Sequence, residues 1–246
     1  MKKENLFTVG LLIADIEEFK PVRNFLVSRG ASSELCFGRQ ILTLDHTAGG
    51  RTVRLLTVYA GIGKANAAAA ATIVAFRGAD AIVSTGFSGG FVPLGDCVAV
   101  TGTNHTEHDF DMIGLGYAPA QKPGQDRWAW PGDPLLIDAC EARFGKLLRG
   151  TLVTGDCFVS SEERVKFCVD TFGAVACDME TAAEAGIAYD AGIRFLSLRF
   201  VSDDASSEEA IENYRDTNTS SATNRFIEVA EWLLSLAEAD DVWQKL

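Results

Sequence analysis

The amino-acid sequence predicts an α/β fold, a single domain over residues 1–246 with a mixed central β-sheet flanked by α-helices. Two observations support this fold class. Short apolar runs of strand length alternate with amphipathic helical stretches along the whole chain. In addition, no linker, internal repeat or low-complexity tract divides the 246 residues, and this length can bury one sizeable core.

The chain is predicted to begin with a buried strand followed by a helix. Phe7–Ile13 predicts a buried strand, and Ile16–Val27 predicts a helix with Asp15 as its N-cap. Lys64–Phe76 predicts a helix whose many alanines allow close packing on the sheet. The segment 104–132 is too long for a simple connector and is expected to contribute to a site. By the same periodicities we expect further strands at 35–45, 52–59, 81–85, 96–103, 151–154, 173–177 and 194–202, and further helices at 133–144, 161–170, 180–191 and 219–238.

Composition limits the classes of partner. The chain has 22 Lys and Arg against 34 Asp and Glu, and the net charge of −12 disfavours nucleic acid and anionic membranes. No basic, apolar leader opens the sequence, and no run reaches the roughly 20 apolar residues that span a bilayer. We therefore expect a cytoplasmic protein that binds a small molecule and has no nucleic-acid or membrane partner.

The cysteines predict neither a disulfide framework nor a metal site. None of the six forms a CxxC pair, and most lie in runs that predict buried strands or helices. With only three histidines, a zinc site is not expected, and no motif requires a metal or an organic cofactor. Small buried thiols in a reducing cytoplasm are the simplest interpretation.

Acidic and glycine-rich segments follow several of the predicted strands, at the edge of the sheet where ligands gather in such folds. Each segment alone has a structural explanation, because glycines can make tight turns and acids can answer a helix dipole. Together they bring several carboxylates to one edge, where like charges in a partly buried cleft raise one another's pKa values and suit acid–base chemistry. The segments are Asp15–Glu18, Gly61–Lys64, Thr85–Gly90, Asp178–Glu180 and Ser202–Asp204, with Arg199 on the strand that delivers Asp203.

From Val9 to about Asp204, the order and spacing of these motifs resemble those of the 5′-methylthioadenosine/S-adenosylhomocysteine nucleosidases. Val9–Glu18 is similar to the family's first strand, which ends in a run of acids. The further matches are Gly61–Lys64 to GIGK, Thr85–Gly90 to TGSAGG, His108–Asp111 with Gly116, Tyr117 and Pro123 to HDADxxxFGYxxGQxP, Gly155–Val159 to GDAFI, Asp178–Glu180 to EMEA, and Arg199–Asp203 to RxISD. The resemblance implies a nucleoside phosphorylase-like fold, hydrolysis of an N-glycosidic bond with release of adenine, and a homodimer.

The resemblance also implies a role for each matching residue. Asp203, protonated at the start, would donate to N7 of adenine, and Glu18 would accept a proton from the attacking water, as in an inverting glycosidase. Glu180 would hold the ribose hydroxyls, and Arg199 would orient the carboxylates and water or form a structural ion pair. The implied substrate contacts are Phe158 and Val159 at adenine, Met179 beside the sugar, and Ile62, Met112, Leu115, Tyr117 and Pro123 around the 5′ substituent, where core packing is the alternative.

A phosphorylase is the main competing reaction. Purine nucleoside phosphorylases share the fold but hold phosphate with cationic side chains, and Ser84-Thr85 stands here where they have an arginine before the glycine motif. The early acids Asp15, Glu17 and Glu18 would moreover repel phosphate. Hydrolysis is therefore favoured, with a non-catalytic nucleoside-binding protein of the same fold as a further alternative.

Two departures from the family pattern bear on the substrate. Phe87 replaces the serine after the first glycine of TGSAGG, with Ser88 displaced by one position, and Asp15 replaces an apolar residue that faces the sugar and its 5′ end. Because a buried acid needs a polar partner, we expect a 5′ group that is more polar or smaller than methylthio. Aminodeoxyfutalosine and 5′-deoxyadenosine stay open as substrates. Tyr214 and Phe226 lie in a region that could reach a neighbouring subunit.

Overall fold

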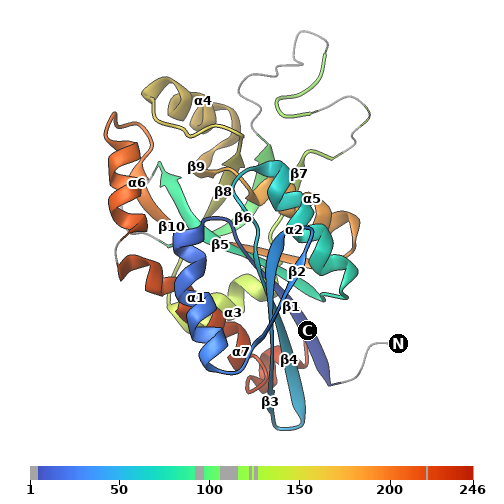
Figure 1. The fold of residues 1–246 in the computed structure, drawn as a ribbon. Coiled ribbons are helices and arrows are strands. Elements are labelled where there is room, and N and C mark those ends of the chain that lie inside the picture. The colour runs from blue at the N-terminus through green and yellow to red at the C-terminus, as the bar shows by residue number, and fades with distance from the viewer. Residues whose placement is uncertain are drawn as a thin grey trace.

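A mixed ten-stranded sheet organises the chain (Figure 1). The structure, a computed structural model, describes residues 5–91, 97–105, 116–121, 124, 127–219 and 221–245. Its strands are β1 Leu6–Ile13, β2 Ser32–Cys36, β3 Arg39–Ala48, β4 Arg51–Tyr59, β5 Ala81–Gly90, β6 Cys97–His105, β7 Ala129–Pro131, β8 Leu148–Thr154, β9 Ala174–Asp178 and β10 Arg194–Asp204. The predicted α/β class with a mixed sheet and flanking helices is confirmed.

The sheet closes on itself around β5. The strand order is β10-β6-β8-β9-β5-β1-β4-β3-β2, and β5 also pairs in parallel with β10, so five strands form a closed circuit. The first half of β5 pairs in parallel with β1, whereas Gly89 and Gly90 at its end pair antiparallel with β9. The long β5 therefore belongs to both parts of the sheet. Its first half pairs with β1 of the open part, and its carboxyl end pairs with β9 and β10 of the closed part.

Helices cover both faces of the sheet (Figure 1). They are α1 Ile16–Ser28, α2 Lys64–Phe76, α3 Pro134–Phe144, α4 Glu162–Phe172, α5 Thr181–Asp190, α6 Ala210–Asn218, the 3₁₀ turn η2 Ser221–Asn224, α7 Arg225–Ser235 and the short α8 Asp240–Trp243. Apolar side chains of α1, α3 and α7 share one buried cluster with the strands, and those of α2 and α5 share another. None of the helices in the described ranges is both long enough and apolar enough to cross a membrane.

Small residues allow α2 to lie close to the sheet, as its alanine-rich sequence predicts. Ala67, Ala70 and Ala71 of this helix are fully buried. Across the interface, a Cβ on Gly10 of β1 would lie 2.7 Å from Val74 Cγ2, closer than packed carbon atoms come. Gly10 is therefore fixed by the close approach of a helix, with no unusual backbone angle required.

The structure corrects several predicted elements. Residues 35–45 are not one strand, because Phe37 (φ 50°) and Gly38 (φ 74°) form a tight turn between β2 and β3. The segment 86–90 continues strand β5 and makes no turn. The predicted final helix, 219–238, is η2 followed by α7, and a helix absent from the prediction, α6, precedes them. The predicted loop 104–132 begins within β6 and contains the whole of β7.

Candidate active site

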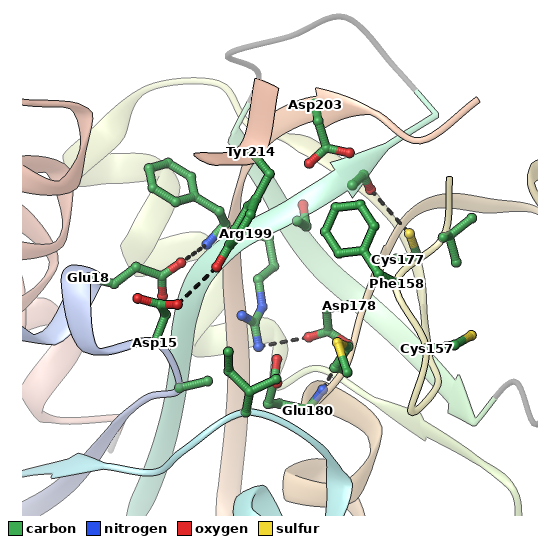
Figure 2. A pocket seen from close by; sticks show the side chains of 17 residues that line it. Asp15, Glu18, Cys157, Phe158, Cys177, Asp178, Glu180, Arg199, Asp203 and Tyr214 are labelled. Atoms are coloured by element: carbon green, nitrogen blue, oxygen red, sulfur yellow. Dashed lines mark hydrogen bonds and ion pairs between the residues drawn. The ribbon is translucent and has the colours of Figure 1, made fainter. Parts of the chain in front are cut away.

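A pocket opens where β1, β5, β8, β9 and β10 end, which is the sheet edge that the sequence predicts (Figure 2). It combines acids, aromatic rings and thiols with one buried arginine. Its described lining consists of Ala14, Asp15, Glu18, Ile62, Phe87, Ser88, Gly89, Cys157, Phe158, Val159, Cys177, Asp178, Met179, Glu180, Arg199, Asp203 and Tyr214.

Arg199 forms the floor of the pocket and is almost fully buried. Its Nη2 lies 2.8 Å from Asp178 Oδ2 and donates to Ser84 Oγ at 2.8 Å and Thr181 Oγ1 at 2.9 Å. Its Nε donates to Ser197 Oγ at 3.1 Å and to Thr181 Oγ1 at 3.2 Å. The guanidinium is thus joined to strands β5, β9 and β10 and to helix α5. A buried charge with so many partners is held in one orientation.

Asp178 is the direct ion-pair partner of Arg199, and its own position is fixed by the start of α5. Thr154 Oγ1 donates to Asp178 Oδ1 at 2.6 Å, and the backbone N–H of Thr181 donates to Asp178 Oδ2 at 3.1 Å. The hydroxyl of Thr181 donates to the same carboxylate. Asp178 therefore serves both as a cap for α5 and as the counter-charge of the arginine, a role that its position in the Asp-Met-Glu motif does not reveal.

Gly86 of β5 makes room for the arginine and for Glu18. A Cβ at this position would lie 2.6 Å from Arg199 Nη1 and 2.9 Å from Glu18 Oε2. Its φ is not in the left-handed region, so the requirement for glycine is steric and does not come from a turn. The glycine motif in the second half of β5 is thus a place where two buried charged side chains cross the strand.

Glu18 stands on the first turn of α1 and points into the pocket. Its side chain is 3% exposed, and its Oε1 accepts a hydrogen bond of 3.0 Å from the backbone N–H of Phe87. Burial raises the pKa of Glu18 to about 8, against the opposing effects of the Phe87 N–H and of Arg199. Asp15 and Glu180 raise this pKa further by charge repulsion.

Glu180 lies where β9 leads into α5, and the start of α2 holds it. Its Oε1 accepts a hydrogen bond of 2.9 Å from the N–H of Gly63. The next amide, that of Lys64, donates to Asp156 Oδ1 at 2.9 Å. Burial raises the pKa of Glu180 to about 7, with Asp178 adding to the rise and Arg199 opposing it. The helix N-terminus, which could bind an anion, is therefore occupied by two carboxylates of the protein.

Asp203 is brought to the pocket by a bulge in β10. Val201 pairs with Ser88 and Asp203 with Gly89, so Ser202 is the extra residue, and such a bulge redirects the side chain that follows. Asp203 Oδ2 accepts a hydrogen bond of 2.7 Å from Ser202 Oγ, whereas Oδ1 has no partner among the described residues. Burial raises the pKa of Asp203 to about 6.

Aromatic and apolar side chains form the remaining walls (Figure 2). The ring of Phe158 is about one third exposed and meets the ring of Tyr214 edge to face, with centroids 5.7 Å apart. Val159, Met179 and Ile62 also line the cavity. A flat, partly exposed ring beside a carboxyl that can hold a proton at neutral pH suits a heteroaromatic base.

The structure brings most of the predicted site residues together. The lining includes all four predicted catalytic residues and, of the predicted contacts, Phe158, Val159, Met179, Ile62, Phe87, Ser88 and Asp15. Tyr117 is half-buried but does not belong to the described lining, and Met112, Leu115 and Pro123 lie outside the described residues.

Two aromatic residues differ from the expectation of a subunit contact. Tyr214 turns into the chain's own pocket, where its hydroxyl donates to Asp15. Phe226 is fully buried and packs edge to face on Phe87, with ring centroids 5.0 Å apart, and on Phe200 at 5.7 Å. Phe226 is therefore not available to a neighbouring subunit, and the hydroxyl of Tyr214 already has a partner within its own chain. Phe87 in turn directs its ring into this core and contributes its N–H to Glu18.

Residues that sequence reasoning did not assign to the site include Tyr214 and the polar partners of Arg199. Ser84 and Thr181 lie within apolar or small-residue stretches, so no local pattern distinguishes them. Glu184 of α5 is also buried beside this network, and burial raises its pKa to about 8. Among the described residues, no group of three His, Cys, Asp or Glu side chains could hold a metal ion.

The fold and the site define the class. A family model for the phosphorylase superfamily matches residues 8–234 of the chain. The chain is similar to a 5′-methylthioadenosine/S-adenosylhomocysteine nucleosidase of Anoxybacillus flavithermus, with 37% identity over 175 residues that cover 67% of this chain and 73% of the relative. The chain belongs to the phosphorylase superfamily and, within it, to the 5′-methylthioadenosine/S-adenosylhomocysteine nucleosidase family.

Solved structures agree with this assignment. The nucleosidase of Neisseria meningitidis in complex with methylthio-immucillin-A is 30% identical, with a TM-score of 0.79, covering 93% of this chain and 99% of that one. A futalosine hydrolase mutant of Helicobacter pylori has a TM-score of 0.81 with 94% and 99% coverage, but its 20% identity shows a shared fold alone. The resemblance predicted from the order of the motifs is confirmed.

Proposed function

We propose that the chain hydrolyses the N-glycosidic bond of an adenine nucleoside, the substrate class that the names of its relatives give. The observation that carries the proposal is one pocket with Asp203 on one wall, Glu18 on another and Glu180 between α2 and α5 (Figure 2). Cleavage of this bond places positive charge on the sugar and negative charge on the base. An acid beside the base can neutralise its negative charge by protonation, and carboxylates beside the sugar can stabilise its positive charge.

Asp203 supplies the proton for the leaving group. A pKa of about 6, raised from the ordinary Asp value, keeps about a tenth of the carboxyl protonated at pH 7, and the bulge at Ser202 directs the donor into the pocket. Phe158 stacks on adenine, and the backbone of Val159 reads its edge. With N7 protonated, adenine leaves as a neutral base, which lowers the barrier to bond cleavage.

Glu18 activates the attacking water, and Glu180 holds the ribose hydroxyls with Met179 beside the sugar. Arg199 is a positioning residue that orients neighbouring side chains and does not touch the substrate, because its guanidinium is already bound to Asp178 and to hydroxyl groups. Negative carboxylates around the anomeric carbon also stabilise the oxocarbenium-like charge that develops there.

Water is favoured over phosphate as the nucleophile. Among the described lining residues Arg199 is the one cation, and its donors are committed to protein partners. The start of α2, a natural anion site, binds Glu180 and Asp156. Both features support hydrolysis, because a phosphorylase needs cationic groups free to receive phosphate.

The direct test is incubation without phosphate. The panel contains 5′-methylthioadenosine, S-adenosylhomocysteine, aminodeoxyfutalosine and inosine, with free base followed by chromatography, and the assay is repeated with phosphate. Adenine released at the same rate with and without phosphate is the expected result. Release that requires phosphate would make the chain a phosphorylase, and nucleoside binding without release would make it a binding protein.

The two catalytic carboxyls predict a bell-shaped pH dependence. Catalysis needs Asp203 protonated and Glu18 ionised, whereas pKa values of about 6 and about 8 favour the opposite arrangement. At pH 7 only about 1% of the molecules then hold the productive arrangement. We expect kcat/KM to be greatest near pH 7 and to fall about tenfold per pH unit below pH 6 and above pH 8. A rate that is constant from pH 5 to pH 9 would contradict these assignments.

We also propose that the chain acts as a homodimer, as its family resemblance implies. The end of β2, the turn after it and the end of α2 expose Leu35 (76%), Phe37 (87%) and Phe76 (89%), and an ion pair between Glu34 and Arg77 joins the two elements. Such an apolar surface favours association. Light scattering should give twice the mass of the chain, and replacing both phenylalanines with Asp should give the monomer.

A cytoplasmic setting is part of the same proposal. The five cysteines whose side chains are described form no disulfide with one another, and two of them, Cys157 and Cys177, line the pocket. Reduced thiols at a working site are compatible with a reducing compartment.

A further inference from the structure

One wall of the pocket carries a polar pair that the reaction does not use. Asp15, at the start of α1, accepts a hydrogen bond of 3.0 Å at Oδ2 from the hydroxyl of Tyr214 on α6 (Figure 2). Asn218, one turn further along α6, donates to the same hydroxyl oxygen at 3.2 Å. The ring of Tyr214 also packs edge to face on Phe158, so α6 presents this hydroxyl from a fixed position.

The carboxylate of Asp15 exceeds what helix capping requires. Its Oδ1 accepts from the N–H of Glu17 at 2.6 Å, which a serine at this position could also do. The negative charge in addition raises the pKa of Glu18 by repulsion. A carboxylate has about four lone-pair sites, and the protein donates to only two of them in the hydrogen bonds described. A partly buried acid in a pocket therefore keeps capacity to accept a hydrogen bond from a ligand.

The position of the pair relative to a nucleoside rests on the proposed function. A nucleoside has three functional ends, which are the base, the 2′,3′-diol and the 5′ carbon. In the proposed function Asp203 and Phe158 contact the base, and Glu180 binds the diol. The wall formed by Asp15 and Tyr214 then faces the 5′ end.

We propose that Asp15, positioned by Tyr214, selects adenine nucleosides whose 5′ substituent carries a hydrogen-bond donor, a hydroxyl or an ammonium group. Such a donor replaces the water that the carboxylate loses when substrate enters the pocket. A methylthio group cannot do so, because a thioether sulfur is at most a weak acceptor. Leaving a carboxylate desolvated, with lone pairs that no donor satisfies, disfavours binding. Sites built around a polar group discriminate strongly against ligands that lack its partner.

The test compares nucleosides that differ only at the 5′ position. Adenosine and 5′-deoxyadenosine differ by one hydroxyl, and 5′-amino-5′-deoxyadenosine and 5′-methylthioadenosine extend the comparison to an ammonium group and a thioether. We expect kcat/KM to be at least tenfold higher for adenosine than for 5′-deoxyadenosine. Asp15→Ser, which keeps a cap for α1, should bring this ratio close to one. Tyr214→Phe should lower it as well, because the carboxylate loses its positioning donor.

Three outcomes would overturn the inference. They are equal kcat/KM values for adenosine and 5′-deoxyadenosine, a preference for 5′-methylthioadenosine over both donor-bearing nucleosides, and an unchanged ratio in folded Asp15→Ser. Absence of base release from every nucleoside would instead contradict the proposed function. In that case the selectivity is measured by binding alone, from the dissociation constants of adenosine and 5′-deoxyadenosine determined by calorimetry on the wild type and on Asp15→Ser. A tenfold difference in the wild type that Asp15→Ser removes supports the inference. Equal constants in the wild type overturn it.

Discussion

Replacing Asp203 with Asn is expected to lower kcat for adenine release by about 10³-fold, within the range that removal of a general acid gives. Asn has nearly the same shape and can still accept a hydrogen bond from Ser202, but it has no proton to give to the base. Its unchanged volume should leave the pocket and the binding of nucleoside nearly intact. The measurement is the initial rate of adenine release at saturating substrate, together with a dissociation constant from calorimetry.

The neighbouring residue provides a matched control. Asp204 carries the same side chain but is exposed, and its carboxylate accepts hydrogen bonds from Ser206 that lower its pKa. Asp204→Asn is expected to keep kcat within a few-fold of the wild type. If Asp203→Asn retained more than a tenth of the activity, another group would have to protonate the leaving base.

Replacing Arg199 with Met should have the largest effect on stability, a loss of about 3–5 kcal/mol in the free energy of unfolding. Asp178 would lose its ion pair, and the buried acids Glu18, Glu180 and Glu184 would lose a nearby positive charge. Removing one member of a buried charge network leaves the others uncompensated, which costs more than the intact network contributes. Denaturant unfolding followed by circular dichroism measures the change.

Arg149 offers the corresponding surface control, because its guanidinium also contacts two acids, Asp138 and Glu141, but lies in solvent. Arg149→Met is expected to change stability little. Arg199→Lys should fall between the two, since it keeps the charge but loses the planar fork that reaches several partners. Equal unfolding midpoints for Arg199→Met and the wild type would show that the arginine does not hold the site together.

The elements that could be predicted are those with their own local pattern. Helix α2 begins and ends at the predicted residues, because its alanines and its flanking glycine define it. The continuation of β5 through 86–90 could not be predicted, since glycines disfavour strands. The glycine at position 86 is required by Arg199 and Glu18, which other elements supply. Helix α6 is mostly polar in sequence, and contacts such as the Tyr214–Asp15 hydrogen bond fix its place.

The site could be predicted as far as motifs extend. Asp203, Glu18, Glu180 and Arg199 follow from the order of short motifs along the chain, and the structure places them in one pocket. Tyr214 could not be found in this way, because the resemblance ends near Asp204. Side chains that act through three-dimensional contacts, with no spacing in sequence, become visible only when the strands are assembled.

The network around Arg199 also has a consequence for the order in which the protein folds. The hydrogen bond between Arg199 and Ser84 joins positions 115 residues apart, and the arginine also needs Asp178 and Thr181 in place. Contacts of such long range form slowly, because a large loop must close before they can stabilise the chain. Recovery of catalysis on refolding should therefore coincide with the last cooperative phase, and a partly folded chain should contain helices without a working centre.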